Sequence, residues 1–327
     1  MPVSFRENYM KFKQFLKLVE IQTKVASMMP LLVGTLVSIY FYGHFSVVNF
    51  FLMLTSLLCI DMATTAINNY MDYQKAIHTT GYGYNGHNAI VKEQLSINRV
   101  RGVILLLIIV GTLLGIGLFL NTDWLVLFIG AVSFIIGIGY TFGPMPISRT
   151  PFGEIISGVV MGLGILFLAV YIHLPNPDWI WLEWTTGGTV NISLKWFEFF
   201  RLAYISMPLV IGIGNIMFAN NICDMEEDWK NHRYTLPLSL GKPLSLSLFG
   251  LAYLGIYVLL AVGALTKLLP MGVLLVFLTL PIVYKQTVTF MKAPVKQINF
   301  VNAVKNFVLI NLAYAISWAV MIGFGNL

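Results

Sequence analysis

Charged residues are scarce in this chain, and their scarcity excludes most soluble folds. Only 10% of the 327 residues are Asp, Glu, Lys or Arg, whereas 57% are hydrophobic. Soluble domains carry roughly 25% charged residues, so this chain has too little polar surface to cover a globule in water. The mean hydropathy of +0.80 agrees with that conclusion. The same composition excludes a disordered chain, which would be polar.

Cysteine is equally scarce, which excludes a disulfide scaffold. The chain has only two cysteines, Cys59 and Cys223, and no His/Cys set has the spacing of a zinc site. The net charge of +6 does not indicate nucleic acid, because the basic residues lie between apolar segments. Cations in that position are typical of membrane topology and of an anionic partner at the membrane. We therefore expect lipid, and no nucleic acid, as a partner.

Long apolar segments recur along the whole chain and predict an all-α, polytopic membrane protein. A bilayer core of ~30 Å needs ~20 helical residues, because hydrocarbon offers no partner for backbone polar groups. Nine segments fit this length: Val25–Tyr42, Val47–Asn69, Val103–Leu120, Trp124–Phe142, Ile155–His173, Leu202–Asn221, Leu246–Leu265, Leu268–Tyr284 and Phe307–Phe324. We expect one transmembrane domain over residues 25–327, with two parallel repeats at about 25–173 and 202–327.

The distribution of lysine and arginine predicts the orientation of these spans. All but three of the 20 basic residues lie in the N-terminal segment or in the loops after spans 2, 4, 6 and 8. The three exceptions are Lys195, Arg201 and Lys267. By the positive-inside rule the N-terminus is cytoplasmic and the C-terminus lies outside, in the plasma membrane. We expect residues 1–24 to form a cytoplasmic, amphipathic segment at the membrane interface. The tryptophan-rich outer loop, Pro175–Phe200, is typical of an interfacial aromatic belt.

A polar motif occurs twice, at equivalent places in the two halves. Asn68-Asn69-x-x-Asp72 ends span 2, and Asn220-Asn221-x-x-Asp224 ends span 6 and continues to Asp228. Both copies lie at the predicted cytoplasmic face, and residues four apart share one face of a helix. Matching polar sets on two halves of a bundle predict one central membrane site. Upstream, Asp61 and Thr65 extend the first set, and Asp61 should face the interior because a charge in lipid costs ~2.5–3.5 kcal/mol.

The chemistry of these side chains favours magnesium and a diphosphate. Carboxylate and amide oxygens are hard ligands, and Mg²⁺ is usually held by one or two carboxylates together with substrate phosphates. Lys92 and Arg233 in the nearby loops, and Lys24 at the mouth of span 1, add positive charge. We therefore expect a metal-bridged diphosphate whose tail lies in the bilayer. The glycine-rich stretch Gly81–Gly86 is not a nucleotide-binding loop, because no strand precedes it. We interpret it as a mobile segment over the site.

These residues resemble the UbiA superfamily of membrane aromatic prenyltransferases, and most of all its 1,4-dihydroxy-2-naphthoate polyprenyltransferases of menaquinone synthesis. The likeness rests on both Asn-Asn-x-x-Asp motifs, on Asp228, Arg233-x-Thr235-Leu236 and Leu240-Gly241, and on Tyr140-Thr141-Phe142-Gly143-Pro144. It covers essentially the whole chain. Three positions differ from that group: Asn69 stands where Asp is usual, Ala76 leaves the first motif without a third acid, and Cys223 stands where Arg is common.

The resemblance implies transfer of a polyprenyl group from its diphosphate to an aromatic ring. It implies Mg²⁺ and diphosphate ligation by Asn68, Asp72, Asn220, Asn221, Asp224 and Asp228, with Lys24, Lys92 and Arg233 on the diphosphate. Asp72, Asp224 and Asp228 are then catalytic, and Tyr140 is a candidate contact for the acceptor or the allylic cation. An apolar interior would house the tail and exclude water. With dihydroxynaphthoate as acceptor, prenylation would accompany loss of its carboxylate.

Two alternatives remain open at this point. Parallel repeats and the intramembrane Asp61 also suit a secondary transporter, although the acids gather at one face and not at the bilayer midplane. Another member of the superfamily would prenylate hydroxybenzoate, homogentisate or haem, or cyclise a terpene. Release of diphosphate in the presence of Mg²⁺ separates the transporter from the enzyme.

Overall fold

The computed structural model describes residues 10–75, 88–143, 146–175 and 180–325. Within these residues nine helices are long and apolar enough to cross a membrane. They are α2 (Val25–Tyr42), α3 (Val47–Lys75), α5 (Ile97–Leu120), α6 (Trp124–Thr141), the composite α7–η4–α8 (Gly153–Ser157, Gly158–Gly164, Ile165–Tyr171), α9 (Trp196–Cys223), α12 (Lys242–Leu265), the composite η5–α13 (Met271–Thr279, Leu280–Lys292) and α14 (Val301–Gly325). The predicted all-α, polytopic architecture is confirmed. The stretch Gly81–Gly86 lies outside the described residues, as do residues 1–9 of the amphipathic segment.

Each predicted span overlaps one of these helices, but several helices run further into polar sequence. α3 continues six residues beyond the predicted end at Asn69, to Lys75, and α5 begins at Ile97 where the prediction began at Val103. Hydropathy marks only the part of a helix that lies in hydrocarbon, whereas the backbone hydrogen-bond ladder continues through the interface. As a consequence Asp72 lies within α3, one turn before its end.

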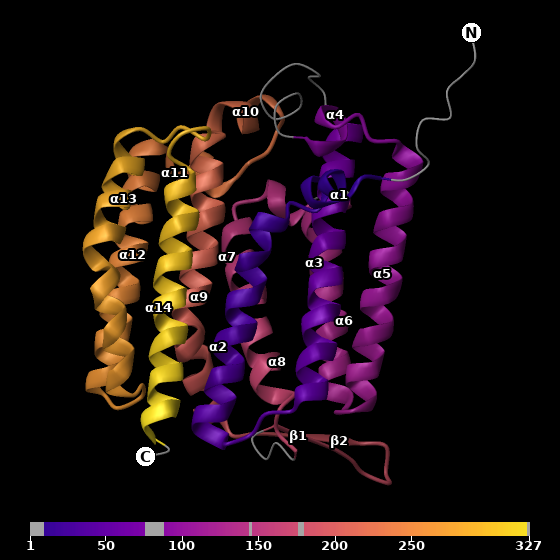
Figure 1. Cartoon of the computed structure of the whole chain (residues 1–327), viewed down its shortest axis with the longest axis vertical. Coiled ribbons are helices and arrows are strands. Elements are labelled where there is room, and N and C mark those ends of the chain that lie inside the picture. Colours follow the sequence, from indigo (N-terminus) through magenta and orange to yellow (C-terminus); the bar gives the residue numbers. More distant parts are fainter. Residues whose placement is uncertain (1–9, 76–87, 144–145, 176–179, 326–327) are drawn as a thin grey trace.

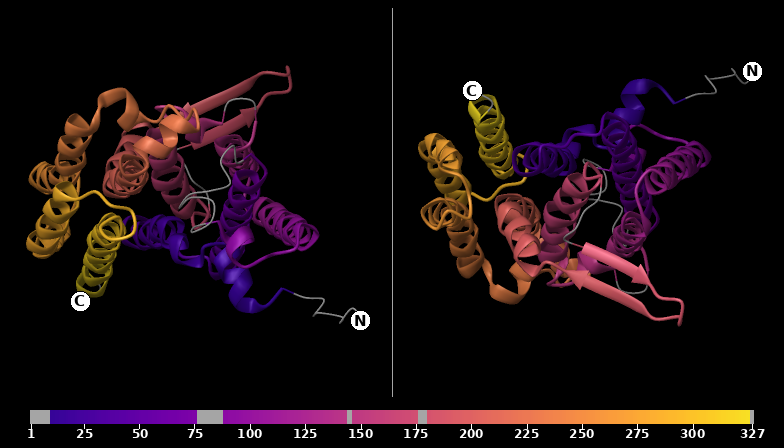
Figure 2. Two further views of the ribbon diagram at one scale, coloured as in Figure 1. Left: turned by 90° about the horizontal axis from the view of Figure 1, so that it is seen from above. Right: turned by 90° about the horizontal axis from the view of Figure 1, so that it is seen from below.

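The helices form three adjoining groups when the bundle is seen along its axis (Figure 2). α3, α5 and α6 contact one another on one side, and α12, η5, α13 and α14 contact one another on the other. α2, the composite α7–η4–α8 and α9 lie between these groups, with α2 against α8 and α14, and α9 against η4 and α12. α3 and α9 both end at the upper end in Figure 1, beside α4 (Ala89–Lys92) and α10 (Met225–Lys230), so both copies of the motif lie at one end of the bundle.

Glycines allow the central helices to approach closely. A Cβ atom on Gly158 would lie 2.5 Å from the backbone oxygen of Val210, and one on Gly162 would lie 2.6 Å from the Val210 nitrogen. Real Cβ atoms do not come this close to backbone, so only glycine fits where η4, a π-helical stretch, crosses α9. This contact fixes the start of α7 against the end of α9, where the second motif begins.

The segments outside the bundle differ in how well the sequence predicted them. α1 (Phe12–Leu18) follows the predicted amphipathic pattern, because Phe12 is exposed while Leu18 is fully buried against α3, α4 and α5. At the opposite end, the tryptophan-rich loop contains an antiparallel hairpin, β1 (Ile180–Trp184) and β2 (Val190–Leu194), that the sequence did not predict. The side chains of Trp184 in β1 and of Trp196 at the start of α9 are 70% and 71% exposed.

Candidate active site

The first motif presents two accessible side chains on α3. Asn68 and Asp72 are exposed and lie one helical turn apart, whereas Asn69 between them is 5% exposed. The amide nitrogen of Asn69 donates to the backbone oxygen of Leu18 (3.1 Å) and to Glu20 Oε1 (3.1 Å). Asn69 therefore attaches the N-terminal segment to α3, while Asn68 and Asp72 remain open to a ligand.

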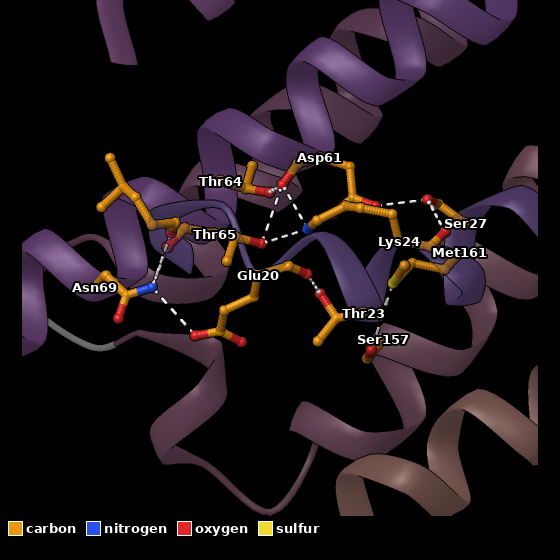
Figure 3. Close-up of polar contacts among 11 residues, drawn as sticks. Glu20, Thr23, Lys24, Ser27, Asp61, Thr64, Thr65, Asn69, Ser157 and Met161 are labelled. Atoms are coloured by element: carbon orange, nitrogen blue, oxygen red, sulfur yellow. Dashed lines mark hydrogen bonds and ion pairs between the residues drawn. The ribbon is translucent and has the colours of Figure 1, made fainter. Parts of the chain in front are cut away.

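Deeper along α3, Asp61 and Thr65, which extend the first motif, are both bound by Lys24 (Figure 3). Lys24 is only 4% exposed, and its ammonium group contacts Asp61 Oδ1 at 2.7 Å, the Asp61 backbone oxygen at 3.1 Å and Thr65 Oγ1 at 2.6 Å. Ser27 donates its hydroxyl to the other Asp61 oxygen. The expectation that Asp61 faces the interior is confirmed. All three hydrogens of the Lys24 ammonium are engaged, so its predicted contact with a diphosphate requires this ion pair to open.

The second motif lies where one helix ends and a short one begins. α9 ends at Cys223, Asp224 adopts a non-helical conformation, and α10 starts at Met225. The amide nitrogen of Asn220 lies 3.4 Å from Asp224 Oδ2, and the Asp228 backbone nitrogen donates to the Asp224 oxygen at 2.7 Å. The break thus keeps Asp224 and Asp228 one turn apart. Glu226 and Glu227 are exposed.

Asp228 is the most deeply buried acid of the two motifs. It is 3% exposed, accepts a hydrogen bond from Thr235 Oγ1 at 3.3 Å, and lies 3.3 Å from Arg233 Nε. Burial raises its pKa to about 6, and the nearby Asp224 carboxylate acts in the same direction, while Arg233 opposes both. Arg233 thus lies at the second motif, and its contact with a diphosphate stays a prediction.

Two further cations, Lys296 and Arg149, belong to this region, although the sequence analysis assigned them only to topology. Lys296, in the loop before α14, forms an ion pair with Asp224. Arg149 lies at the end of η3 (Ile147–Arg149), and its backbone oxygen accepts a hydrogen bond of 3.0 Å from the backbone N–H of Tyr234. Asp72 interacts electrostatically with Arg233, Arg149 and Lys296. The cations that neutralise the second motif therefore also act on the first, and the two motifs converge.

Asn221 and Tyr140 meet at a buried acid that the sequence analysis did not single out. Glu154, at the start of α7, is 4% exposed, and its Oε1 accepts the Asn221 amide at 2.7 Å while Oε2 has no partner. The Tyr140 hydroxyl lies 3.5 Å from the Gly153 backbone oxygen and interacts electrostatically with Glu154. Glu154 accepts from the amide nitrogen of Asn221, so the Asn221 oxygen is the atom that a cation would contact, and here it accepts a long hydrogen bond (3.5 Å) from the Asn220 amide. An acid one residue before an apolar span was the only signal for Glu154.

Lys92 stands apart from these contacts. It is the last residue of α4, and its side chain is exposed. The Asn88 side chain caps α4 and donates to the backbone oxygen of Asn69 at 2.8 Å, which holds α4 on the end of α3. Lys92 is therefore near the first motif, and its contact with a diphosphate stays a prediction.

The donor chemistry of the site fits a hard divalent cation. Among the described residues no three His, Cys, Asp or Glu side chains are grouped closely enough to hold a metal ion by themselves. Mg²⁺ does not need such a cage, because it keeps several waters and takes one or two carboxylates together with phosphate oxygens. Lys296 on Asp224 and Arg233 on Asp228 show that both carboxylates already attract positive charge.

Comparison with known proteins agrees with this geometry. The profile of the UbiA prenyltransferase family matches residues 27–311. The chain is 32% identical, over 264 residues, to the 1,4-dihydroxy-2-naphthoate octaprenyltransferase of Bacillus subtilis (strain 168), a match covering 79% of this chain and 76% of the relative.

Solved structures of similar fold include two UbiA homologues. An apo structure from Aeropyrum pernix K1 has a TM-score of 0.63 at 16% identity and covers 94% of this chain and 99% of that one. A homologue from Archaeoglobus fulgidus bound to DMAPP and Mg²⁺ has a TM-score of 0.58 at 11% identity, with coverage of 94% and 99%. At these identities the structural likeness speaks for the fold alone. Taken with the family match over most of its length, the chain belongs to the UbiA prenyltransferase family.

Proposed function

We propose that this protein transfers a polyprenyl group from polyprenyl diphosphate to 1,4-dihydroxy-2-naphthoate, a step of menaquinone biosynthesis. Two observations support the acceptor and the reaction: the B. subtilis relative has that activity by name, and the two acidic motifs share their cations at one end of the bundle. The convergence of Asp72 with Asp224 and Asp228 is the observation on which the proposal depends.

The residues of the site divide the work of binding the diphosphate. The proposed Mg²⁺ ligands are Asn68, Asp72, Asn220, Asn221, Asp224 and Asp228. When bound, magnesium supplies Lewis-acid neutralisation of the charge on the leaving diphosphate. Arg233, Arg149 and Lys296 surround the same carboxylates and contribute fixed positive charge toward the phosphate oxygens. Lys92 and Lys24 are secondary candidates, the latter only if its ion pair with Asp61 opens.

The apolar helices supply the second requirement, exclusion of water. The C–O bond to the diphosphate breaks with its electron pair leaving on oxygen, which produces an allylic cation. The electron-rich ring attacks this cation, and the ring then loses its carboxylate as carbon dioxide. A dry, apolar interior prevents water from trapping the cation first. To Tyr140, beside Glu154 at the end of α6, we assign the role of steadying the cation or contacting the acceptor through its ring.

The proposal also includes an orientation. α3 and α9, which carry the two motifs, end beside α1, α4 and α10 at one end of the bundle (Figure 1). We place that end at the cytoplasm and the C-terminus outside the plasma membrane, by the distribution of lysine and arginine. Cysteine substitutions on α10 should react with a membrane-impermeant thiol reagent only in inside-out vesicles, and reaction in right-side-out vesicles contradicts this orientation.

Turnover of purified variants tests the function. With Mg²⁺, a polyprenyl diphosphate and dihydroxynaphthoate, the wild-type protein should release diphosphate and form the prenylated ring. Asp72→Asn and Asp224→Asn should each lower kcat by at least about 10²–10³-fold, the usual cost of removing a group that stabilises the transition state. Glu226→Gln, an exposed acid on α10, is the matched control and should keep wild-type kcat.

Two outcomes would contradict the proposal. Activity near wild type in both aspartate variants removes the assignment of the site. Turnover with hydroxybenzoate, homogentisate or haem, in the absence of turnover with dihydroxynaphthoate, removes the acceptor while keeping the reaction. The quinones of a deletion strain give an independent answer, because menaquinone should be absent and the naphthoate precursor should accumulate.

A further inference from the structure

Two adjoining cavities lie at the end of the bundle opposite the candidate active site. The larger, of about 460 Å³, lies between the ends of α2, α9 and α12 and is lined mainly by apolar side chains, among them Phe41, Phe200 and Tyr204. The smaller, of about 350 Å³, is lined by Phe41, Leu269 and Met271. Lys267 lines both, so two apolar cavities flank one ammonium group.

The charge around these cavities is positive. Lys267 and Arg201 line the larger one, and no Asp or Glu is among the described residues that line either. Arg201 stacks on Phe41 with its guanidinium carbon 4.1 Å from the ring centroid, and Glu198 pairs with one of its terminal nitrogens. The buried Arg201 Nε has no hydrogen-bond partner. Glu198 thus compensates Arg201, and Lys267 supplies the net charge.

Lys267 occupies a backbone position that glycine usually takes. Lys267 follows the end of α12 with φ of +59°, in the left-handed region. Its backbone nitrogen donates to Ala264, and that of Leu269 donates to Gly263, which closes the helix end. Glycine adopts this conformation freely and is the usual residue at such a position. A strained residue that persists is a reason to look for a function of its side chain.

The position of these cations is also unexpected from topology. Lys195, Arg201 and Lys267 are the three basic residues that the positive-inside rule leaves at this end. Two of the three line one cavity. Exposed aromatic side chains at the start of α9, Trp196 and Phe197, are typical of the headgroup level of a bilayer. Two cations beside apolar cavities match the chemistry of an anionic headgroup with acyl chains.

We infer that these cavities bind one anionic diacyl phospholipid of the leaflet farther from the active site, with its phosphate at Lys267 and Arg201 and its acyl chains in the two cavities. The inference does not depend on the proposed reaction, because it involves neither motif. Binding fixes the ends of α2, α9 and α12 to one another.

Binding of phosphatidylglycerol to the full-length protein in mixed micelles tests the inference. Phosphatidylglycerol should raise Tm and remain bound in native mass spectrometry, whereas phosphatidylcholine should do neither. Lys267→Gly removes the charge without straining the backbone, so the variant should fold. It should bind phosphatidylglycerol about fivefold more weakly, since one cation near a lipid surface contributes about that factor. Lys267→Arg should bind as wild type does.

Lys195→Gln is the matched control, because it removes the same charge at the same end but lines neither cavity. An equal loss of binding in Lys195→Gln would reduce the effect to general surface charge and overturn the site. Equal binding of phosphatidylglycerol by wild type and Lys267→Gly would also overturn it. Full competition by millimolar inorganic phosphate would show an anion site and no lipid site.

Discussion

In the copy of the motif on α3, Asp72 is exposed and no described residue forms an ion pair with it, whereas in the copy on α9 and α10 Asp224 and Asp228 are paired with Lys296 and Arg233. The same five-residue pattern thus gives an open carboxylate in one half and compensated carboxylates in the other. The difference arises from the surroundings: α3 runs uninterrupted past its motif, while α9 breaks at Asp224 and turns the chain back toward Arg233.

The carboxylates of the second motif are thus paired with cations before any ligand binds, so this half of the site is preformed. The carboxylate of Asp72 is open to a ligand. On α3 the only compensated acid is Asp61, which lies deeper and is held by Lys24. The electrostatic reach of Arg233 and Lys296 to Asp72 links the halves. Four changes break or sharpen the contrast between them.

The largest effect on folding is expected at Lys24. Lys24→Met leaves the Asp61 carboxylate buried without its cation, and removal of one partner of a buried pair typically costs about 3–5 kcal/mol. Thermal unfolding in detergent should show a large fall in Tm. The double variant Lys24→Met/Asp61→Leu should recover most of the loss, because it removes both charges. No recovery would mean that Lys24 acts elsewhere.

The next effect separates Asp228 from Asp72. Asp228→Asn replaces a buried carboxylate whose pKa the fold raises to about 6, so the charged form opposes folding at neutral pH and the neutral amide should keep or raise the free energy of unfolding. Asp72→Asn, at an exposed position, should change that free energy by less than about 0.5 kcal/mol. Unfolding curves of the two variants at pH 7 measure the difference directly, and a clear loss of stability in Asp228→Asn would contradict this account of the buried half.

Lys296 should affect substrate binding more than folding. Lys296→Gln takes away a cation that reaches both motifs, so we expect the KM for polyprenyl diphosphate to rise about tenfold, equivalent to roughly 1.4 kcal/mol. Lys292→Gln, at the exposed end of α13, is the control and should leave KM unchanged. An unchanged KM in Lys296→Gln would confine this lysine to a structural role.

The smallest effect is expected at Cys223, a position at which the resemblance to the naphthoate group implies Arg. Cys223 is half-buried and lies near Asp224 and Lys296. Cys223→Arg should change kcat and KM by no more than about threefold, or roughly 0.7 kcal/mol. Steady-state kinetics decide it, and a severe loss of diphosphate binding would argue against aligning this segment with its relatives.

Much of the fold was predictable because hydrophobicity alone sets the spans. Every predicted span overlaps a helix, and the interior placement of Asp61 followed from the cost of a charge in lipid. The lengths of α3 and α5 were not predictable from hydropathy, because their polar ends lie outside hydrocarbon. The π-helical crossing at Gly158 and Gly162 depends on a partner helix that is distant in sequence.

The site was predictable in its acids and less so in its cations. Two matched motifs identify Asp72 and Asp224 without any structure, since their repetition has no topological cause. Lys296 and Arg149 gave no comparable signal, because the positive-inside bias accounts for any lysine or arginine in those loops. Lys24 was predicted to contact the diphosphate, and only the fold shows that its ammonium group is paired with Asp61.

The glycine crossing of η4 and α9 also connects mid-membrane packing to chemistry. Gly158 contacts Val210 one turn after Glu154, and Glu154 holds the amide of Asn221 at the far end of α9. The two helices are therefore joined at two points, the contact of Gly158 with Val210 and the hydrogen bond from Asn221 to Glu154. A methyl group at Gly158 would push η4 and α9 apart and move Glu154 away from Asn221. A packing defect inside the bundle would then lower turnover at the end that carries the second motif.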